Sequence, residues 1–476
     1  MSLPANFSYF MQRLQGVSTS HFKINPQTGG NQTSGKLVRF ELPTNSLVNL
    51  KSLRCFFAAN TSGSGAISLP ADVSSFVERI SIYMGGVLVG NGHQGYNTLV
   101  HAKKALCGDK CNPTLGHPEI VRAKSYHNGA SFADGAPETY ADNGREHFCI
   151  DHWEGLLGSL EPSIIDTGLF PQITVELTLA DDTVCGTSLG RKIGDKIGTA
   201  KTATAGLTDG GTALTFDAHG TVAPTYTLNE MTMQVEVLGM ASNVLDAIVE
   251  QRIASVGYLS LPFKNYYSYQ SNHTNTSRFN VNSASWDRLW LVYRPTDYTT
   301  KAAPRVAEGY KIKGGFLGAT DGASTTTIDA GLPQYDAGGT SFADGEKYIS
   351  NYFRFQEKKT DATANAFFQL QVNSANIPAY RMTTPEALAM SLNSVDERSK
   401  KHMSLKQYTT DSFVQVYRFC LPESDGSRLA SGVDTRSVSA QGSIITDNID
   451  ACTLTMFAEV TSELRVGASR AIEVIF

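Results

Sequence analysis

Two segments in opposite halves of the chain share one outline, and this internal repetition constrains the fold more than any other feature. Arg39–Phe57 reads RFELPTNSLVNLKSLRCFF, and Arg278–Tyr293 reads RFNVNSASWDRLWLVY. Each begins with Arg-Phe in a short strand pattern, turns at an Asn-Ser pair (Asn45-Ser46 or Asn282-Ser283) and continues into an apolar strand. The repetition predicts one β-domain design that occurs twice.

The chain after the first copy predicts a hairpin and then a helix. In Val77–Val89, apolar residues alternate with polar ones, which is the period of a half-buried strand. Gly85-Gly86 suits a two-residue hairpin turn, because both turn positions need a positive φ. Tyr96–Leu106 has the spacing of a helix, with Tyr96, Leu99 and Val100 on one side.

The chain after the second copy repeats this order. Phe367–Val372 is expected to be a strand, Asn373-Ser374 a tight turn and Ala375–Ile377 the return strand. A helix is expected to start at Thr384-Pro385-Glu386, with Thr384 as the cap residue and proline in the first turn. Antiparallel strands in this density, with few helices, favour an all-β fold of two double-sheet jelly-roll barrels.

The length fits two such domains. The chain has 476 residues, which exceeds the roughly 250–300 residues at which one core stops growing. We expect an N-terminal arm at residues 1–30, a first barrel at 31–242 and a second at 243–476. Gly186–Pro224 and Pro295–Gly345 are rich in Gly, Thr, Ala and Asp, and we expect them to be long exposed loop insertions.

The arm carries a short amphipathic pattern. Phe7, Phe10, Met11 and Leu14 lie at i, i+3, i+4 and i+7, which forms one apolar stripe on a helix. So short a helix is not stable alone, and it needs a surface to lie on. Packing against protein is the simpler expectation, and a lipid face is the alternative.

Charge and cysteine content narrow the function classes. The net charge of −5 argues against a general nucleic-acid binder, which would carry a basic face. The seven cysteines, without a signal-peptide pattern, are expected to be free thiols in a reducing compartment. No apolar run approaches the roughly 18 residues that a spanning helix needs.

Gly90-x-Gly92-x-x-Gly95 has the spacing of a dinucleotide-binding loop, and it follows a strand and precedes a helix. The strand before it is expected to be the return arm of a hairpin. A dinucleotide fold needs a buried parallel strand there, so we do not expect a nucleotide site.

The other candidate sites are weaker. Cys107, Cys111, His101 and His117 form one loose group of metal-ligand types, and His147, Cys149 and His152 form another, but neither has a common zinc spacing. The acidic groups Asp181-Asp182 and Asp151/Glu154 are better explained by turns, and the basic cluster Arg191, Lys192, Lys196 and Lys201 by a solvated loop. We expect no catalytic residue, no metal and no cofactor.

The sequence resembles the double jelly-roll major capsid proteins of tailless icosahedral double-stranded DNA viruses, the lineage of adenovirus, virophages, polinton-like viruses and lipid-containing phages. The matching segments keep one joint order in both halves. They are FELPTNSLVNLKSL, ERISIYMGGVLVGNGHQGYNTL, DTGLFPQITVELTLA (Asp166–Ala180), LPFKNYYSY (Leu261–Tyr269), the strand pair Ser277–Arg294, FQLQVNSANIPAY (Phe368–Tyr380), ASGVDTR and TSELRVG.

The resemblance implies two consecutive eight-stranded jelly rolls and a non-enzymatic structural role. It implies a homotrimer, whose six barrels form a pseudo-hexagonal capsomer that tiles an icosahedral shell. Its partners would be further capsomers, penton and minor capsid proteins and, in lipid-containing members, an internal membrane. The protein would be made in the host cytoplasm and would reside in the virion capsid, with Phe7, Phe10, Met11 and Leu14 on the inner face and the loop insertions on the outside.

Two alternatives stay open from the sequence. The first is a glycan-binding or glycan-cleaving β-sandwich protein, which would line a cleft with tryptophan; only three occur, and Trp286 and Trp290 share a strand. The second is a trimeric host-attachment protein, which would form spikes and would not tile a surface.

Overall fold

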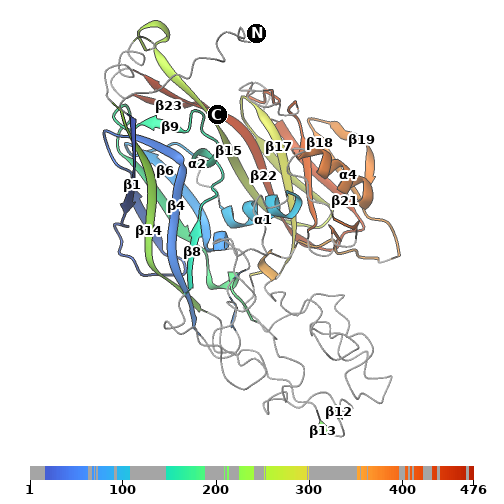
Figure 1. Ribbon diagram of the computed structural model, residues 1–476. Helices are drawn as coiled ribbons and strands as arrows, with labels where there is room; N and C mark the ends of the chain where they lie inside the picture. The colour runs from blue at the N-terminus through green and yellow to red at the C-terminus, as the bar shows by residue number, and fades with distance from the viewer. Residues whose placement is uncertain are drawn as a thin grey trace, which may run out of the picture.

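The structure, a computed structural model, describes residues 17–107, 146–187, 225–240, 251–299 and 351–475, several of these ranges with short gaps, together with 208–209 and 212–213. Two β-sandwiches lie side by side in the chain (Figure 1). In the described part of the chain, none of the helices has the length and apolar character needed to cross a membrane.

The first sandwich contains two antiparallel sheets. One sheet has the order β1 (Val17–Ile24), β14 (Thr225–Met240), β4 (Leu47–Ser62), β8 (Glu146–Ile150). The short strands β2 (Gln32–Thr33) and β9 (Ile164–Asp166) pair with β14 and β4 of this sheet. The facing sheet has the order β3 (Leu37–Glu41), β10 (Ile173–Leu179), β6 (Val77–Met84), β7 (Val87–Leu88).

The second sandwich repeats this arrangement. One sheet has the order β15 (Tyr258–His273), β22 (Cys452–Gly467), β17 (Trp286–Pro295), β20 (Val414–Arg418), with β23 (Ile472–Ile475) on β22. The facing sheet has the order β16 (Thr276–Val281), β21 (Ala440–Asp447), β18 (Phe367–Val372), β19 (Ala375–Thr383).

The two sandwiches have the same topology. When the eight main strands of each are numbered along the chain, one sheet reads 1-8-3-6 and the other reads 2-7-4-5 in both halves. All the pairings within these sheets are antiparallel. Two packed four-stranded layers connected in this way form a jelly roll. The predicted all-β double jelly roll is therefore confirmed.

Each jelly roll has its own hydrophobic core, but each core also contains residues from the other half of the chain. Alternate residues of β4, such as Leu53, Cys55 and Phe57, point into the first core. Leu261 and Phe263 belong to β15 of the second sandwich but pack in the first core. Both faces of β17 are buried, which requires something to cover the outer face of its sheet.

The tight turns agree with the sequence. Gly85 and Gly86 have φ values of 59° and 84° between β6 and β7, as the predicted hairpin requires. Asn373 and Ser374 have φ values of 47° and 71° between β18 and β19. The return strand β19 continues to Thr383, beyond the expected end at Ile377.

Helix α1 spans Tyr96–Leu106, as predicted. Helix α4 spans Thr384–Ser394, but its cap residue is Thr383, so the expected cap at Thr384 is wrong by one position. The reason is a capping box, in which Thr383 and Glu386 satisfy each other's backbone N–H groups at the helix start.

The remaining elements are short. They are the helix α2 (Leu156–Ser159), the 3₁₀ turns η2 (Val73–Phe76), η5 (Asp182–Val184) and η7 (Asn351–Phe353), and the strand pairs β5 (Ile67–Ser68) with β11 (Gly186–Thr187) and β12 (Thr208–Asp209) with β13 (Thr212–Ala213).

The segment expected to be an arm contains a strand that the sequence did not predict. Strand β1 lies within residues 1–30 and pairs with β14 along its whole length. Its sequence, VSTSHFKI, lacks a regular apolar alternation, because its described side chains are exposed or half-buried on both faces. The division of the chain at residue 242 falls between β14 and β15 and stays a prediction.

Candidate functional site: the seam between the sandwiches

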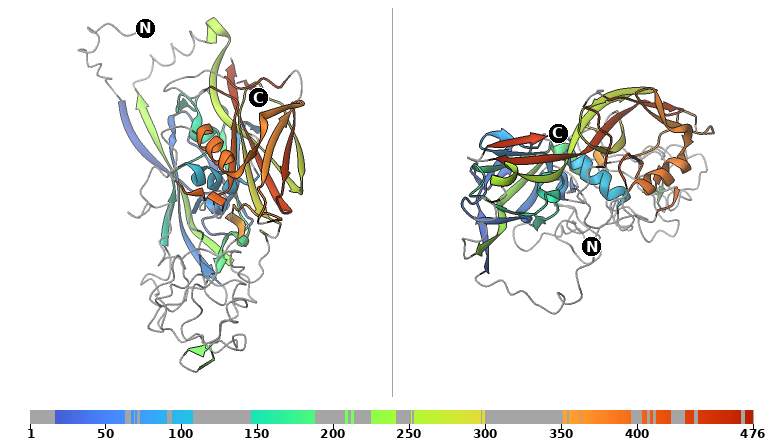
Figure 2. Two further views of the ribbon diagram at one scale, coloured as in Figure 1. Left: turned by 90° about the vertical axis from the view of Figure 1, so that its right-hand side faces the viewer. Right: turned by 90° about the horizontal axis from the view of Figure 1, so that it is seen from above.

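Helix α1 lies between the two sandwiches and contributes to both cores (Figure 2). Tyr96 and Val100 pack in the first core, whereas Leu99, Ala102 and Leu106 pack in the second. The three residues in the second core lie at i, i+3 and i+7, which places them on one face of the helix. The helix therefore covers the outer face of the sheet that contains β17.

Polar contacts fix α1 on this sheet. The Lys103 ammonium donates to Glu154 Oε2 at 2.6 Å and to the Tyr266 hydroxyl at 2.5 Å. Burial alone would lower the pKa of Lys103, but the negative charges around it, Glu154 foremost, raise this pKa well above its ordinary value. Near the other end of α1, Arg294 donates to Thr98 Oγ1 at 3.2 Å.

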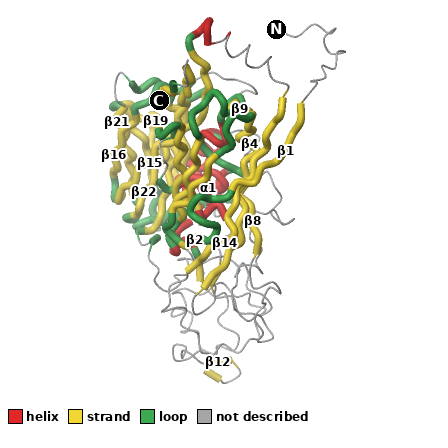
Figure 3. The backbone as a smooth tube through the Cα atoms, turned by 90° about the vertical axis from the view of Figure 1, so that its left-hand side faces the viewer, coloured by secondary structure: helices red, strands yellow, loops and turns green. Residues whose placement is uncertain are grey.

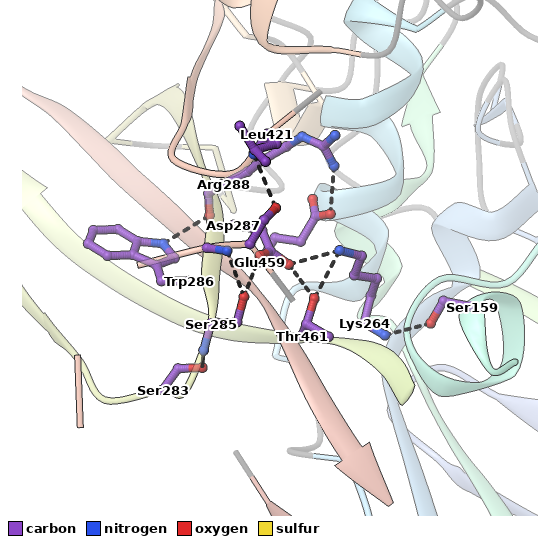
Figure 4. Close-up of polar contacts among 12 residues, drawn as sticks. Ser159, Lys264, Ser283, Ser285, Trp286, Asp287, Arg288, Leu421, Glu459 and Thr461 are labelled. Carbon is purple, nitrogen blue, oxygen red and sulfur yellow. Dashed lines mark hydrogen bonds and ion pairs between the residues drawn. The ribbon is translucent and has the colours of Figure 1, made fainter. Parts of the chain in front are cut away.

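A second group of charges lies on the same sheet (Figure 4). The Lys264 ammonium is 2.8 Å from Asp287 Oδ2, and Thr461 Oγ1 donates to the same carboxylate oxygen at 2.5 Å. Ser285 Oγ donates to Asp287 Oδ1 at 2.8 Å. Asp287 is only 1 % exposed, so these donors provide the stabilisation that water would otherwise give its charge.

Glu459 is a second buried acid, on the central strand β22 of the sheet. Its carboxylate accepts from Arg288 Nη1 at 2.9 Å and from Trp290 Nε1 at 2.9 Å. Burial raises the pKa of Glu459, but Arg288, Lys103 and Lys264 outweigh burial and lower it to about 2. The charges are mutually compensated, which is the arrangement of a structural network. An acid or base in catalysis would instead have a pKa shifted toward neutrality.

The segment around α2 closes the edge of β15. The backbone N–H of Lys264 donates to Ser159 Oγ at 2.7 Å, and the N–H of Glu161 donates to the Pro262 carbonyl at 3.2 Å. These bonds use backbone groups that an open edge strand would expose. The first jelly roll thus contacts the second through both α1 and α2.

The two Asn-Ser turns are held in the same way in each half. The N–H of Ser46 donates to Thr167 Oγ1 at 2.9 Å, and the hydroxyl and N–H of Thr167 both donate to the Ser46 carbonyl. Ser283 and Thr435 form the same three bonds. We call each arrangement a Ser-Thr clasp. The clasps show the duplication at the level of single hydrogen bonds.

Gly90 and Gly95 of the glycine-rich motif are described, whereas Gly92 lies outside the described residues. Strand β7, which precedes it, pairs antiparallel with β6, as expected for a hairpin. Gly95 is the N-cap of α1 with a φ of 74°, and an added Cβ there would lie 3.6 Å from the Phe457 ring. The helix N-terminus therefore faces the second sandwich.

Candidate metal ligands in the described part of the chain have other contacts. His101 bonds to Ser75 and stacks on Phe353, and burial raises the pKa of the Cys107 thiol to about 11, which disfavours the thiolate that zinc binds. His152 pairs with Asp151. Among the described residues, no three His, Cys, Asp or Glu side chains form a metal-binding group.

The acidic candidates have structural partners. Asp181 accepts from the N–H of Thr183, as turn chemistry predicts, and Asp182 accepts from the N–H of Tyr226. Glu154 pairs with Lys103, a contact that no local sequence pattern indicates, because the two residues lie 51 positions apart along the chain. All three tryptophans, Trp153 included, are buried, so none of them lines an open glycan cleft.

Several expected features lie outside the described residues. They are the apolar stripe Phe7, Phe10, Met11 and Leu14, the cysteine and histidine Cys111 and His117, the basic cluster Arg191, Lys192, Lys196 and Lys201, and nearly all of both loop insertions. Their roles stay predictions.

Comparison with known proteins shows a relationship of fold. No protein-family model matches the sequence, and no curated protein matches it either. The PBCV-1 virus capsid structure is 12 % identical with a TM-score of 0.52, over 99 % of this chain and 100 % of that one. The Faustovirus major capsid protein is 9 % identical with a TM-score of 0.52, over 95 % and 91 % of the two chains. A chain of the Sputnik virophage structure is 9 % identical with a TM-score of 0.50, over 100 % and 92 %.

Proposed function

We propose that this chain, which has the double jelly-roll fold of viral major capsid proteins, is itself the major capsid protein of an icosahedral virus. Three copies would form a pseudo-hexagonal capsomer, and capsomers would tile the shell without catalysis or a cofactor. The observation that carries the proposal is the identical strand order of the two jelly rolls. Two equivalent barrels per chain turn threefold symmetry into a nearly sixfold outline that can cover a flat facet.

The strand registers put residue 17 and the first residue after the first insertion at opposite ends of the same strand. Val17 pairs with Met240 at one end of β14, so the N-terminal segment joins the sheet at this end. Thr225, where the chain re-enters after the first insertion, lies at the other end, about 50 Å away for 16 residues in a strand. In the second jelly roll, Tyr258 and Pro295 pair with opposite ends of β22. We assign the N-terminal end to the shell interior and the insertions to the outside.

The interior assignment gives the apolar stripe a role. Phe7, Phe10, Met11 and Leu14 would contact neighbouring capsomers, minor or penton proteins, or an internal membrane. Replacing all four by serine should leave the capsomer intact but reduce the yield of closed shells, measured by sedimentation of assembled particles. Shells that form with unchanged yield would contradict this role.

Molar mass and particle shape test the function directly. Light scattering on the purified protein should give three times the chain mass of 51.4 kDa, and negative-stain images should show hexagonal plates. Spike-shaped trimers would favour the host-attachment alternative. A glycan array should be negative, because the three tryptophans are buried.

A further inference from the structure

The outer face of the first sandwich's larger sheet corresponds to a face of the second sandwich that α1 covers. In the second sandwich, the outer face of β15, β22 and β17 presents the aromatic residues Tyr266, Phe457 and Trp290, and α1 lies on it. Helix α1 comes from the connection between the fifth and sixth strands, β7 and β8, of the first jelly roll. Within the chain, this connection of one jelly roll therefore packs on the outer face of the next.

The corresponding face of the first sandwich is an open groove. It has a volume of about 790 Å³ and is lined by residues of β1, β4, β14 and the turn after β1, including Lys23, Phe56, Thr232 and Gln234. Phe56 is 36 % exposed, although its neighbours Cys55 and Phe57 are buried. Figure 3 shows these strands at the surface, with no described helix in front of them.

Helix α4 is the counterpart of α1 in the second jelly roll. It also connects the fifth strand, β19, to the sixth, β20. One face packs on its own jelly roll through residues that include Ala387 and Ser391, whereas Ala389 and Asn393 are exposed and Leu388 and Leu392 are half-buried beside them.

The exposed face of α4 has an unusual composition for a solvated helix. Surface helices normally carry charged residues on the outer face. The only charged residue of α4 is Glu386, and its carboxylate already closes the capping box. Leu388 and Leu392 pack against the core of their own jelly roll, and the small uncharged residues Ala389 and Asn393 suit close contact with another surface.

The groove and the exposed face of α4 lie on opposite sides of the molecule. Strands β1, β4 and β14 face the viewer when the left-hand side of Figure 1 is turned forward (Figure 3), and α4 faces the viewer from the right-hand side (Figure 2). Two different surfaces at opposite ends form a head-to-tail contact, and such contacts generate a closed ring when the rotation closes.

We propose that α4 of one copy docks in the groove around Phe56 of a second copy of this chain, as α1 docks on the second sandwich within the chain. This inference rests on the proposed trimer, and it names the surfaces that join the copies. Three such contacts alternate with the three internal seams around a ring of six jelly rolls. The groove is lined by both Lys23 and Glu230, so the contact that we propose depends mainly on shape and apolar surface.

The test uses one substitution on each surface and a matched control. Phe56→Glu and Ala389→Glu should each raise the trimer dissociation constant at least tenfold, measured by mass photometry over a dilution series. Val87→Glu alters a residue that is 49 % exposed on β7, outside the groove, and should leave the trimer unchanged. Thermal unfolding identifies a variant that does not fold, and Thr232→Arg or Asn393→Arg then replaces it on the same surface.

A mixture of the two variants tests the head-to-tail geometry. Each variant keeps one intact surface, so the mixture should form a heterodimer through a single junction, although neither variant does so alone. Folded groove and α4 variants that stay trimeric like wild type would overturn this inference and leave the capsid proposal standing. A wild-type chain that is monomeric would overturn the proposed trimer itself.

Discussion

In each jelly roll, one threonine hydroxyl fixes the Asn-Ser turn at the equivalent position. Thr167 and Thr435 are buried, and each makes three bonds to the serine of an Asn-Ser turn. The sequence suggested the turns, but it could not show the clasps, because each threonine lies more than a hundred residues from its serine.

Removing either hydroxyl should therefore have the same effect. Thr167→Val and Thr435→Val keep the side-chain shape but leave a serine N–H without its acceptor, which costs about 1–3 kcal/mol of unfolding free energy. Urea denaturation measures this, with the exposed Thr276→Val as control. A change in only one of the two variants would contradict the equivalence of the clasps.

His273 makes the second jelly roll sensitive to acid. It is 1 % exposed, bonds to Ser277 and Thr446, and lies beside the Tyr293 ring. Burial lowers its pKa from 6.5 to about 4. The unfolded chain then binds more protons between these values, so stability that is complete above pH 6.5 is lost as the pH falls toward 4.

The free energy of unfolding should fall by at most about 1.4 kcal/mol for each pH unit in this range. Urea unfolding at pH 7 and pH 5 should show a smaller loss of stability for His273→Asn than for wild type. The exposed His21→Asn serves as control. An identical pH dependence in wild type and His273→Asn would exclude this histidine as the cause.

Gly442 provides space for an aromatic ring. It lies opposite Phe279 in the β16–β21 pair, and a Cβ added there would lie 2.1 Å from the ring. Gly442→Ala should lower the unfolding free energy by about 1–3 kcal/mol, as overpacking does. At Gly90 an added Cβ meets nothing within 4 Å, so Gly90→Ala is the control, and equal costs at both sites would refute the steric explanation.

At the scale of elements, α1 belongs to the first half by sequence and to both halves by packing. Leu106 is fully buried in the second core, whereas Val100 packs in the first. Leu106→Ala should cost about 2–5 kcal/mol and should increase hydrogen exchange in β17 and β22. Val100→Ala should increase exchange in β6 instead. Exchange changes confined to the first jelly roll in both variants would contradict the shared helix.

The sequence predicted elements better than contacts. Local signals, such as Gly85-Gly86 and the spacing in Tyr96–Leu106, located the hairpin and the helix correctly. Strand β1 was missed because its exposed side chains leave no alternation to detect. The seam charges were missed because Lys103 lies 51 residues from Glu154 and Lys264 lies 23 residues from Asp287, so no local pattern indicates either pair.

At the scale of the whole molecule, one seam within the chain joins two jelly rolls of the same topology. It leaves uncovered, among the described residues, the groove around Phe56 on the first jelly roll and the exposed face of α4 on the second. The seam unites apolar packing of α1 with compensated charges around Glu459, so the two jelly rolls should unfold together. The shared topology of the two halves is the basis of the proposed ring of three chains.

An averaged electron-microscopy image of the purified assembly along its axis tests this account most directly. The proposed ring predicts three chains arranged as six lobes of similar size. A helix should lie between each two neighbouring lobes, α1 at the seams within a chain and α4 at the seams between chains. A solitary two-lobed particle at high protein concentration, or a trimer whose six lobes do not form a ring, would contradict it.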